Sequence, residues 1–268
     1  MNDLVSAIAS NFVEQPVLKK QGVYRSSTKA FIISMINDHS STVALRKCLL
    51  SIKSTGSHIN PFIMDATTPL NLQEHLKTFN LTVDNWTYPK SPAEQKTDIN
   101  SGLVLTGYRT NDLHKVISCL VSHMRLWRLC TELNENIIIL EHDAIFTKKF
   151  KIEDLKESFT GGVLGLNSPL GATRRAKVYD REVKINTIEQ RKIICDAPWI
   201  DKKHIPQGIA GNSAYLIKPE AADHLLKKIE KVGMWPNDAL MCKQFFPWLQ
   251  QAYPYYTTVQ GTKSSTTL

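Results

Sequence analysis

Short apolar runs, separated by longer amphipathic segments, dominate the pattern of this sequence. The runs cover residues 31–36, 62–64, 137–140, 163–166 and 214–217. Runs of this length, bounded by turn residues, are typical of buried strands. Between them, apolar residues recur at helical spacing from Asp112 to Trp127, and again in a segment bracketed by Pro219 and Gly233. The alternation predicts an α/β protein whose helices pack against a sheet.

The length and composition favour one compact domain with an ordinary core. The chain has 268 residues, 42% of them hydrophobic and 22% charged, which excludes a disordered, collagenous or disulfide-stapled protein. Residues 1–28 contain no clear strand, so we expect them to form a helical or irregular arm outside the sheet. Residues 29–268 are expected to form the single domain.

The cysteine content and the hydropathy of the chain indicate the cellular compartment in which it works. No apolar run approaches the ~18 residues that a membrane span requires, and the first residues lack the features of a signal peptide. The five cysteines are widely spaced and contain no Cys-x-x-Cys pair, which argues against a disulfide framework or a thiolate zinc site. We therefore expect a cytoplasmic protein without a membrane span.

The charge of the chain favours anionic partners. Its net charge is +8, which suits phosphates, nucleotides, nucleic acid or acidic glycans. Residues 172–205 carry nine Lys or Arg against five Asp or Glu, an excess of four. This segment is expected to be a basic loop, which is either a solvated surface insertion or a binding element.

Two carboxylates directly follow the apolar run at 137–140. In an extended strand, Glu141 and Asp143 would project to the same side while His142 faces the other way. The carboxyl ends of buried strands are where open α/β sheets bind ligands, and a pair of carboxylates there suits a hard divalent cation that also holds phosphate. Alternatively, these acids only cap the turn after the strand.

The segment around this acidic pair resembles a known enzyme family. Cys119-Leu-Val-Ser122-His123-Met-Arg-Leu-Trp127, followed by Ile137-Ile-Ile-Leu-Glu141-His-Asp143, is similar to the central signature of family 25 glycosyltransferases. The resemblance implies a single GT-A-like (Rossmann-like) domain with a mixed central sheet flanked by helices. It also implies an inverting transfer of sugar from a nucleotide-sugar donor, with a UDP-sugar favoured, to a hydroxyl of a glycan or lipooligosaccharide.

The same resemblance assigns residues to the donor site. Arg46 follows the opening strand, and Asp65 lies in Ile63-Met-Asp65-Ala66, which looks like the family segment that touches the nucleoside. Ser122 and His123 are implied to lie in the donor site or to position the acidic strand. Gly211 begins Gly211-Asn-Ser-Ala214-Tyr215, which resembles a further family strand.

The chemistry itself is assigned to three carboxylates. Glu141 and Asp143 are implied to be ligands of Mn²⁺ (or Mg²⁺), with Glu141 also available to the donor. Pro236-Asn-Asp238 resembles the family's Pro-Val-Asp, so Asp238 is expected to be the catalytic base, although this residue also suits a helix cap.

Two other functions remain open from the sequence. The net charge and the basic segment suit an enzyme of the same chemistry that modifies hydroxylated bases in DNA. A catalytically silent binding module on the same fold is a third possibility, because a fold does not establish activity.

Overall fold

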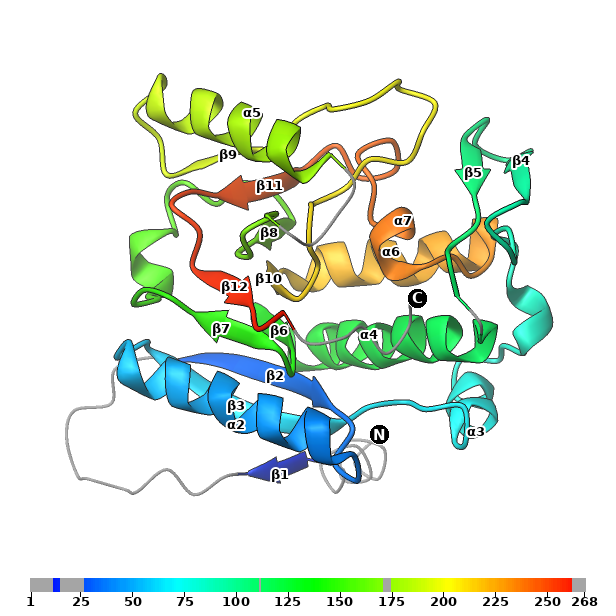
Figure 1. The fold of residues 1–268 in the computed structure, drawn as a ribbon, viewed down its shortest axis with the longest axis horizontal. Coiled ribbons are helices and arrows are strands. Elements are labelled where there is room, and N and C mark those ends of the chain that lie inside the picture. The colour runs from blue at the N-terminus through cyan, green and yellow to red at the C-terminus, as the bar shows by residue number, and fades with distance from the viewer. Residues whose placement is uncertain (1–11, 15–26, 111, 171–174, 262–268) are drawn as a thin grey trace.

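A mixed sheet organises the molecule. The computed structural model describes residues 12–14, 27–110, 112–170 and 175–261. Within them an eight-stranded sheet has the order β1-β3-β2-β6-β10-β8-β11-β9 (Figure 1). In chain order these strands are β1 Phe12–Glu14, β2 Thr28–Ser34, β3 Ile59–Asp65, β6 Ile137–Glu141, β8 Val163–Gly165, β9 Ile194–Asp196, β10 Ala214–Ile217 and β11 Leu249–Ala252.

The directions of the central strands bring several chain segments to one edge of the sheet. β2 pairs in parallel with both β3 and β6, so the carboxyl ends of these three strands lie together. β10 pairs antiparallel to β6, with Ala214 opposite Leu140. The amino end of β10 therefore meets the carboxyl end of β6, and the segment before Ala214 lies next to Glu141.

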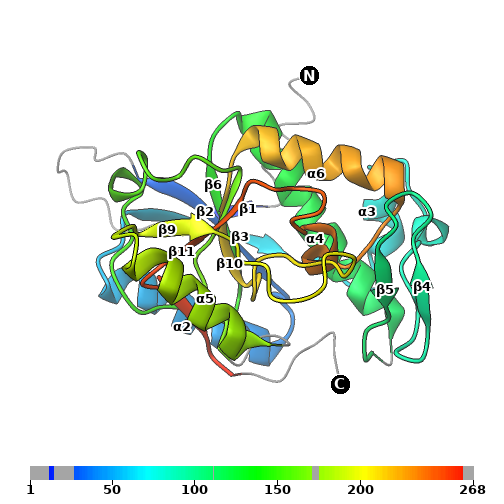
Figure 2. The ribbon, with the colours of Figure 1, turned by 90° about the horizontal axis from the view of Figure 1, so that it is seen from above.

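Helices cover both faces of this sheet (Figures 1 and 2). Side chains of α4 and α6 share one buried cluster with alternate strand residues, and side chains of α2 share a second cluster on the opposite face. The helices are α2 His39–Ser54, α3 Leu72–Lys77, α4 Leu113–Leu133, α5 Ala176–Ile188, α6 Pro219–Val232 and α7 Asn237–Leu240, with 3₁₀ turns η1 Val83–Asn85 and η2 Ile152–Asp154.

Two small sheets complete the described structure. β4 Gln95–Thr97 and β5 Val104–Thr106 form an antiparallel pair. β7 Ala144–Phe146 directly follows the turn after β6 and pairs with β12 Thr257–Val259 near the end of the chain. The last described segment therefore lies beside the turn that carries Asp143.

β6 shows why its apolar run is continuous. Ile137 and Ile139 belong to the cluster that contains α4 and α6. Ile138 and Leu140 belong to the cluster that contains α2. Because side chains of a strand alternate between faces, a strand covered on both sides needs apolar residues at every position.

Local signals explain where the two helices on the first face begin and end. The Asp112 side chain accepts a hydrogen bond from the backbone of His114 at the start of α4, as an N-cap residue does. Pro219 opens α6, and Gly233 follows it with φ 84° while its N–H donates to Ile229. Both helices lie where the periodicity predicts them, and all five apolar runs form strands.

The expected arm differs in part from the structure. Residues 12–14 form the edge strand β1, paired with β3, because backbone pairing needs no periodic pattern in so short a segment. Residues 1–11 and 15–26 lie outside the described part, so the division at residue 28 stays a prediction.

The expected basic loop also differs from the structure. The segment contains α5 and β9 instead of a loop, since Tyr179 and Val183 bury one face of α5.

Candidate functional site

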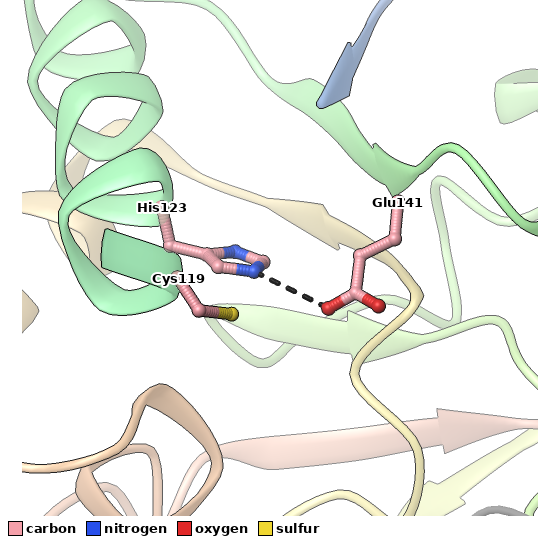
Figure 3. Close-up of side chains that lie close together, drawn as sticks. All are labelled: Cys119, His123 and Glu141. Carbon is pink, nitrogen blue, oxygen red and sulfur yellow. Dashed lines mark ion pairs between the residues drawn. The ribbon is translucent and has the colours of Figure 1, made fainter. Parts of the chain in front are cut away.

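A histidine of α4 and a glutamate of β6 meet at the carboxyl edge of the sheet. His123 Nε2 lies 3.6 Å from Oε1 of Glu141 (Figure 3). The His123 side chain is almost wholly buried, whereas 34% of the Glu141 side chain is exposed. Cys119 lies one helical turn before His123, and Figure 3 shows its thiol on the same side. The pair thus joins a buried ring to a carboxylate that solvent reaches.

Two aromatic side chains, Tyr215 and Trp127, pack on the side of the His123 ring that is opposite Glu141. The Tyr215 hydroxyl of β10 lies 2.8 Å from His123 Nδ1, and Trp127 Nε1 donates to the same hydroxyl at 2.9 Å. All three side chains are buried. The rings of His123 and Tyr215 are nearly parallel, with centroids 5.8 Å apart. The orientation of His123 is therefore fixed by packing as well as by hydrogen bonds.

The environment keeps Glu141 ionised. Burial raises its pKa, but the nearby His123 ring and then the charge of His142 outweigh burial, so the pKa is below its ordinary value. Its backbone N–H donates to Ser213 just before β10. By contrast, burial and the nearby charges of Glu141 and Asp238 raise the pKa of Cys119, which keeps the thiol protonated.

The carboxylate of Asp238, on α7, lies close enough to Glu141 for the two charges to interact. The residue reaches solvent, yet the protein around its carboxylate raises its pKa. The charge of Glu141 raises this pKa further, and hydrogen bonds from Tyr108 and from backbone N–H groups oppose the shift without cancelling it. Asn237, the neighbour of Asp238, accepts a long hydrogen bond of 3.9 Å from the Cys119 thiol.

Asp143 does not lie where strand alternation predicts it. β6 ends at Glu141, and His142 and Asp143 form a turn into β7, so the period of two does not extend to Asp143. The charge of Asp143, together with burial as the larger effect, raises the pKa of Cys48 on α2 to about 12. Gln260 donates to the backbone of Asp143. Asp143 thus lies near α2, whereas Glu141 faces α4.

His142 lies in the same turn, so strand alternation does not fix its orientation either. Its charge lowers the pKa of Glu141, after the larger effects of burial and His123. Its charge also contributes to the lowered pKa of Asp38, after the hydrogen bonds to Ser40 and Ser41 and the opposing effect of burial. The charge of His142 therefore acts on Glu141, and no described contact joins the two side chains.

Ser122 and Asp65 lie on the α4 and β3 side of this edge. The Ser122 hydroxyl accepts from the backbone of Thr67 and donates to Ser118, so it joins α4 to the segment after β3. Asp65 accepts from the backbone of Ile36. Arg125 donates to the Asp65 carbonyl, a contact that the sequence analysis did not anticipate, because a lone arginine on a helix carries no signal.

Arg46 and Gly211 are the remaining expected donor residues. Arg46 is exposed on α2. Gly211 has φ 81° in the turn that leads into β10, a conformation that favours glycine. Backbone geometry therefore explains why residue 211 is a glycine. Arg46 is an exposed cation, and no described contact assigns it to the site.

A family model decides what kind of protein carries this arrangement. The model, described as glycosyltransferase family 25 (LPS biosynthesis protein), matches residues 27–241. The chain belongs to glycosyltransferase family 25. The match contains α4, β6, β10 and Asp238, and the mixed sheet between two layers of helices is that of the GT-A-like fold expected from the sequence.

The similarity to individual proteins is more distant. A procollagen lysyl hydroxylase and glycosyltransferase of Acanthamoeba polyphaga mimivirus is 29% identical over 109 residues, which are 38% of this chain and 10% of that protein. Mouse xyloside xylosyltransferase 1 is 12% identical, with a TM-score of 0.38 and coverage of 83% of both chains. The galactosyltransferase LgtC, solved with donor and acceptor sugar analogues, is 12% identical, with a TM-score of 0.39 and coverage of 84% of this chain and 73% of its own.

Side chains of this family 25 member also form a possible cation site. The ligand atoms of Cys119, His123 and Glu141 all lie within 4.8 Å of one another. Glu141 offers the ionised oxygen that a hard cation prefers, whereas sulfur and imidazole nitrogen suit softer metals. The nearby negative charges of Glu141 and Asp238 oppose each other, so a cation bound here would relieve that repulsion. Glu141 therefore fits the expected divalent ion.

The basic segment of this family 25 member is partly neutralised by its own acids. Arg175 lies 3.3 Å from Asp201, and Lys184 lies 2.8 Å from Asp180. Residues 171–174 lie outside the described part. Exposed cations such as Lys177, Arg191 and Lys192 remain on the surface. Among the described residues, no helix has the length and apolar character to cross a membrane.

Proposed function

We propose that this chain is an inverting glycosyltransferase that moves a sugar from a nucleotide-sugar donor to a hydroxyl of a glycan or lipooligosaccharide. The observation that carries the proposal is the pair Glu141 and Asp238. The pKa of Glu141 is lowered and that of Asp238 is raised, and each carboxylate comes from a different element at the same edge of the sheet. Two carboxylates whose environments push their pKa values apart are typical of divided catalytic roles.

Asp238 has the properties of the base. Its raised pKa makes the ionised carboxylate a better proton acceptor than an ordinary aspartate. The carboxylate would take the proton from the acceptor hydroxyl as that oxygen attacks the anomeric carbon. One base on the acceptor side, without a second protein nucleophile, accounts for inversion.

Glu141 serves the donor side. Its carboxylate stays ionised, and His123 and the hydrogen bond from its own backbone to Ser213 hold it at the end of β6. Mn²⁺ or Mg²⁺ would be held by Glu141 and, as the family resemblance implies, by Asp143. When bound, the ion would neutralise the charge that develops on the departing nucleoside diphosphate.

The remaining donor contacts extend the proposal. Asp65, Ser122, His123 and Gly211 lie on the elements that meet at the carboxyl edge of β2, β3 and β6, and Arg46 would add a cation from α2. The family description supports a lipopolysaccharide-type acceptor. A UDP-sugar donor and a cytoplasmic location stay predictions. The prediction of a cytoplasmic location is supported by the five cysteines, which are all free.

Donor binding tests the proposal directly. Thermal unfolding should be measured with a panel of nucleotide sugars, each with and without Mn²⁺, because a ligand that binds only the folded state raises the melting temperature. We expect a UDP-sugar to raise it only when Mn²⁺ is present. Stabilisation by none of the nucleotide sugars would refute the donor class.

A further inference from the structure

Tyr215 has a hydroxyl that joins two other buried side chains. Its oxygen lies 2.9 Å from Trp127 Nε1 and 2.8 Å from His123 Nδ1, and in the described part of the chain these are its hydrogen-bond partners. Tyr215 is fully buried. Its hydroxyl can therefore use only these partners to satisfy one proton and its lone pairs.

The tryptophan fixes the direction of one of these two hydrogen bonds, and the phenolic proton fixes the other. Indole Nε1 is only a donor, so the Tyr215 oxygen must accept from Trp127. The phenolic proton then needs an acceptor, and His123 Nδ1 is the partner that can provide a lone pair. With Nδ1 accepting, the neutral imidazole carries its proton on Nε2. The opposite tautomer would leave the phenolic proton buried without an acceptor among the described residues, which is unfavourable.

We propose that Tyr215 is a positioning residue that fixes the tautomer of His123, so that its Nε2–H faces Glu141. Nε2 lies 3.6 Å from Oε1 of Glu141 and has no closer hydrogen-bond acceptor among the described residues. Among the described residues, the carboxylate that this buried N–H faces at that distance is thus the one at the end of β6. In this network each N–H or O–H donor points toward the carboxyl edge of the sheet. The donors follow one another from Trp127 to Tyr215, from Tyr215 to His123, and from His123 toward Glu141.

The direction of this network also bears on the cluster that contains Cys119. Nε2 cannot ligate a metal while it carries a proton. A metal held by Cys119, His123 and Glu141 together would require the opposite tautomer, which Tyr215 and Trp127 disfavour. His123 therefore directs an N–H toward Glu141, and a divalent ion at this edge would take its ligands from carboxylates.

The tautomer can be read without any enzyme assay. Selective ¹⁵N labelling of histidine allows each ring nitrogen to be observed by NMR, and His123→Gln identifies the His123 signals by their loss. Spectra should be recorded above about pH 8, where an ordinary histidine is neutral. We expect His123 to show an unprotonated Nδ1 and a protonated Nε2. A protonated Nδ1 in the wild type would overturn the proposal.

Two variants assign the effect to the network. In Tyr215→Phe the phenolic proton is gone, so a mixture of tautomers should replace the single one. In Trp127→Phe the Tyr215 oxygen loses its donor, but the phenolic proton still has only His123 Nδ1 as an acceptor among the described residues, so the wild-type tautomer should persist. Tyr256→Phe, in the cluster on the other face of the sheet, is the matched control and should leave His123 unchanged. An unchanged tautomer in Tyr215→Phe would contradict the role of Tyr215; if that variant does not fold, the wild type and Trp127→Phe decide.

The catalytic consequence rests on the proposed function. Loss of an outer hydrogen bond to a ligand-orienting histidine typically weakens metal-dependent binding by about 10–100-fold. Tyr215→Phe should therefore raise the donor KM by about tenfold and change kcat less. If the wild type transfers no sugar, the proposed function fails, but the NMR result still tests the tautomer.

Discussion

His123 Nε2 and Glu141 Oε1 lie 3.6 Å apart, which ties the end of β6 to the middle of α4. The contact joins a buried ring to a carboxylate that is partly exposed. It also lowers the pKa of Glu141 against the opposing effect of burial. The ionised carboxylate to which we assign donor binding is thus a product of the packing of α4 against the sheet.

Removing the charge of Glu141 should weaken donor binding. Glu141→Gln keeps the size of the side chain but loses the ionised oxygen, and hydrogen bonds to charged groups contribute about 1.5–3 kcal/mol. We expect donor affinity to fall at least about tenfold, measured by calorimetric titration in Mn²⁺. Glu135→Gln, whose carboxylate pairs with Lys29 at the other end of β6, is the control and should bind normally.

Replacing Asp238 should separate catalysis from binding. Asp238→Asn removes the proposed base, so turnover should fall by about 10²–10⁴-fold while nucleotide-sugar affinity stays near that of the wild type. Single-turnover kinetics and calorimetry give the two quantities. An equal loss of donor affinity would instead assign Asp238 to the donor site.

The same variant should not lose stability. A folded-state pKa that is raised means that the folded protein binds more protons here than the unfolded chain, so ionised Asp238 costs stability at neutral pH. This cost disappears as the pH falls below the unfolded pKa of about 3.9. Asp238→Asn should therefore unfold at the same temperature as the wild type, or higher, at pH 7. A clearly lower melting temperature would show that the carboxylate is structural.

The fold could be predicted further than the site. Runs such as 137–140 and 214–217 identify strands because burial on both faces requires apolar residues at each position, and Pro219 and Gly233 mark both ends of α6. The three-residue β1 and β9 carry no such signal, since neighbouring backbone, not periodicity, forms them.

Within the site, spacing along the chain was informative only inside regular elements. Cys119 and His123 are one helical turn apart and do lie together. Asp143 was misplaced because the strand ends two residues before it. Neither the approach of Asp238 to Glu141 nor the hydrogen bond of Tyr215 to His123 follows from sequence spacing, because each joins elements that only the tertiary fold brings together.

The role of Asp143 can be tested independently of its position. Asp143→Asn should abolish Mn²⁺-dependent donor binding if the family resemblance assigns this ligand correctly, because a neutral amide is a poorer ligand for a hard cation. Nucleotide-sugar titration with and without Mn²⁺ measures the effect. Persistence of the full Mn²⁺ effect would remove Asp143 from the ligand set and leave Glu141.

The acceptor class can be read from salt dependence. Neutralising the exposed Lys177, Arg191 and Lys192 should leave binding of a neutral glycan and its salt slope unchanged, because counterion release requires contacts to a polyanion. We expect this result, since part of the segment is already paired with its own acids. A steep salt dependence of duplex DNA binding that weakens in the triple variant would instead favour a DNA acceptor.

Sugar transfer itself tests the central claim most directly. The purified chain should be incubated with each of a panel of nucleotide sugars, with Mn²⁺ or with a chelator, and the release of nucleoside diphosphate measured in the presence of lipooligosaccharide. We predict that one UDP-sugar is turned over in Mn²⁺, that the chelator stops the reaction, and that Asp238→Asn lacks it. Release that is absent for every donor, or equally fast in Asp238→Asn, would contradict the account.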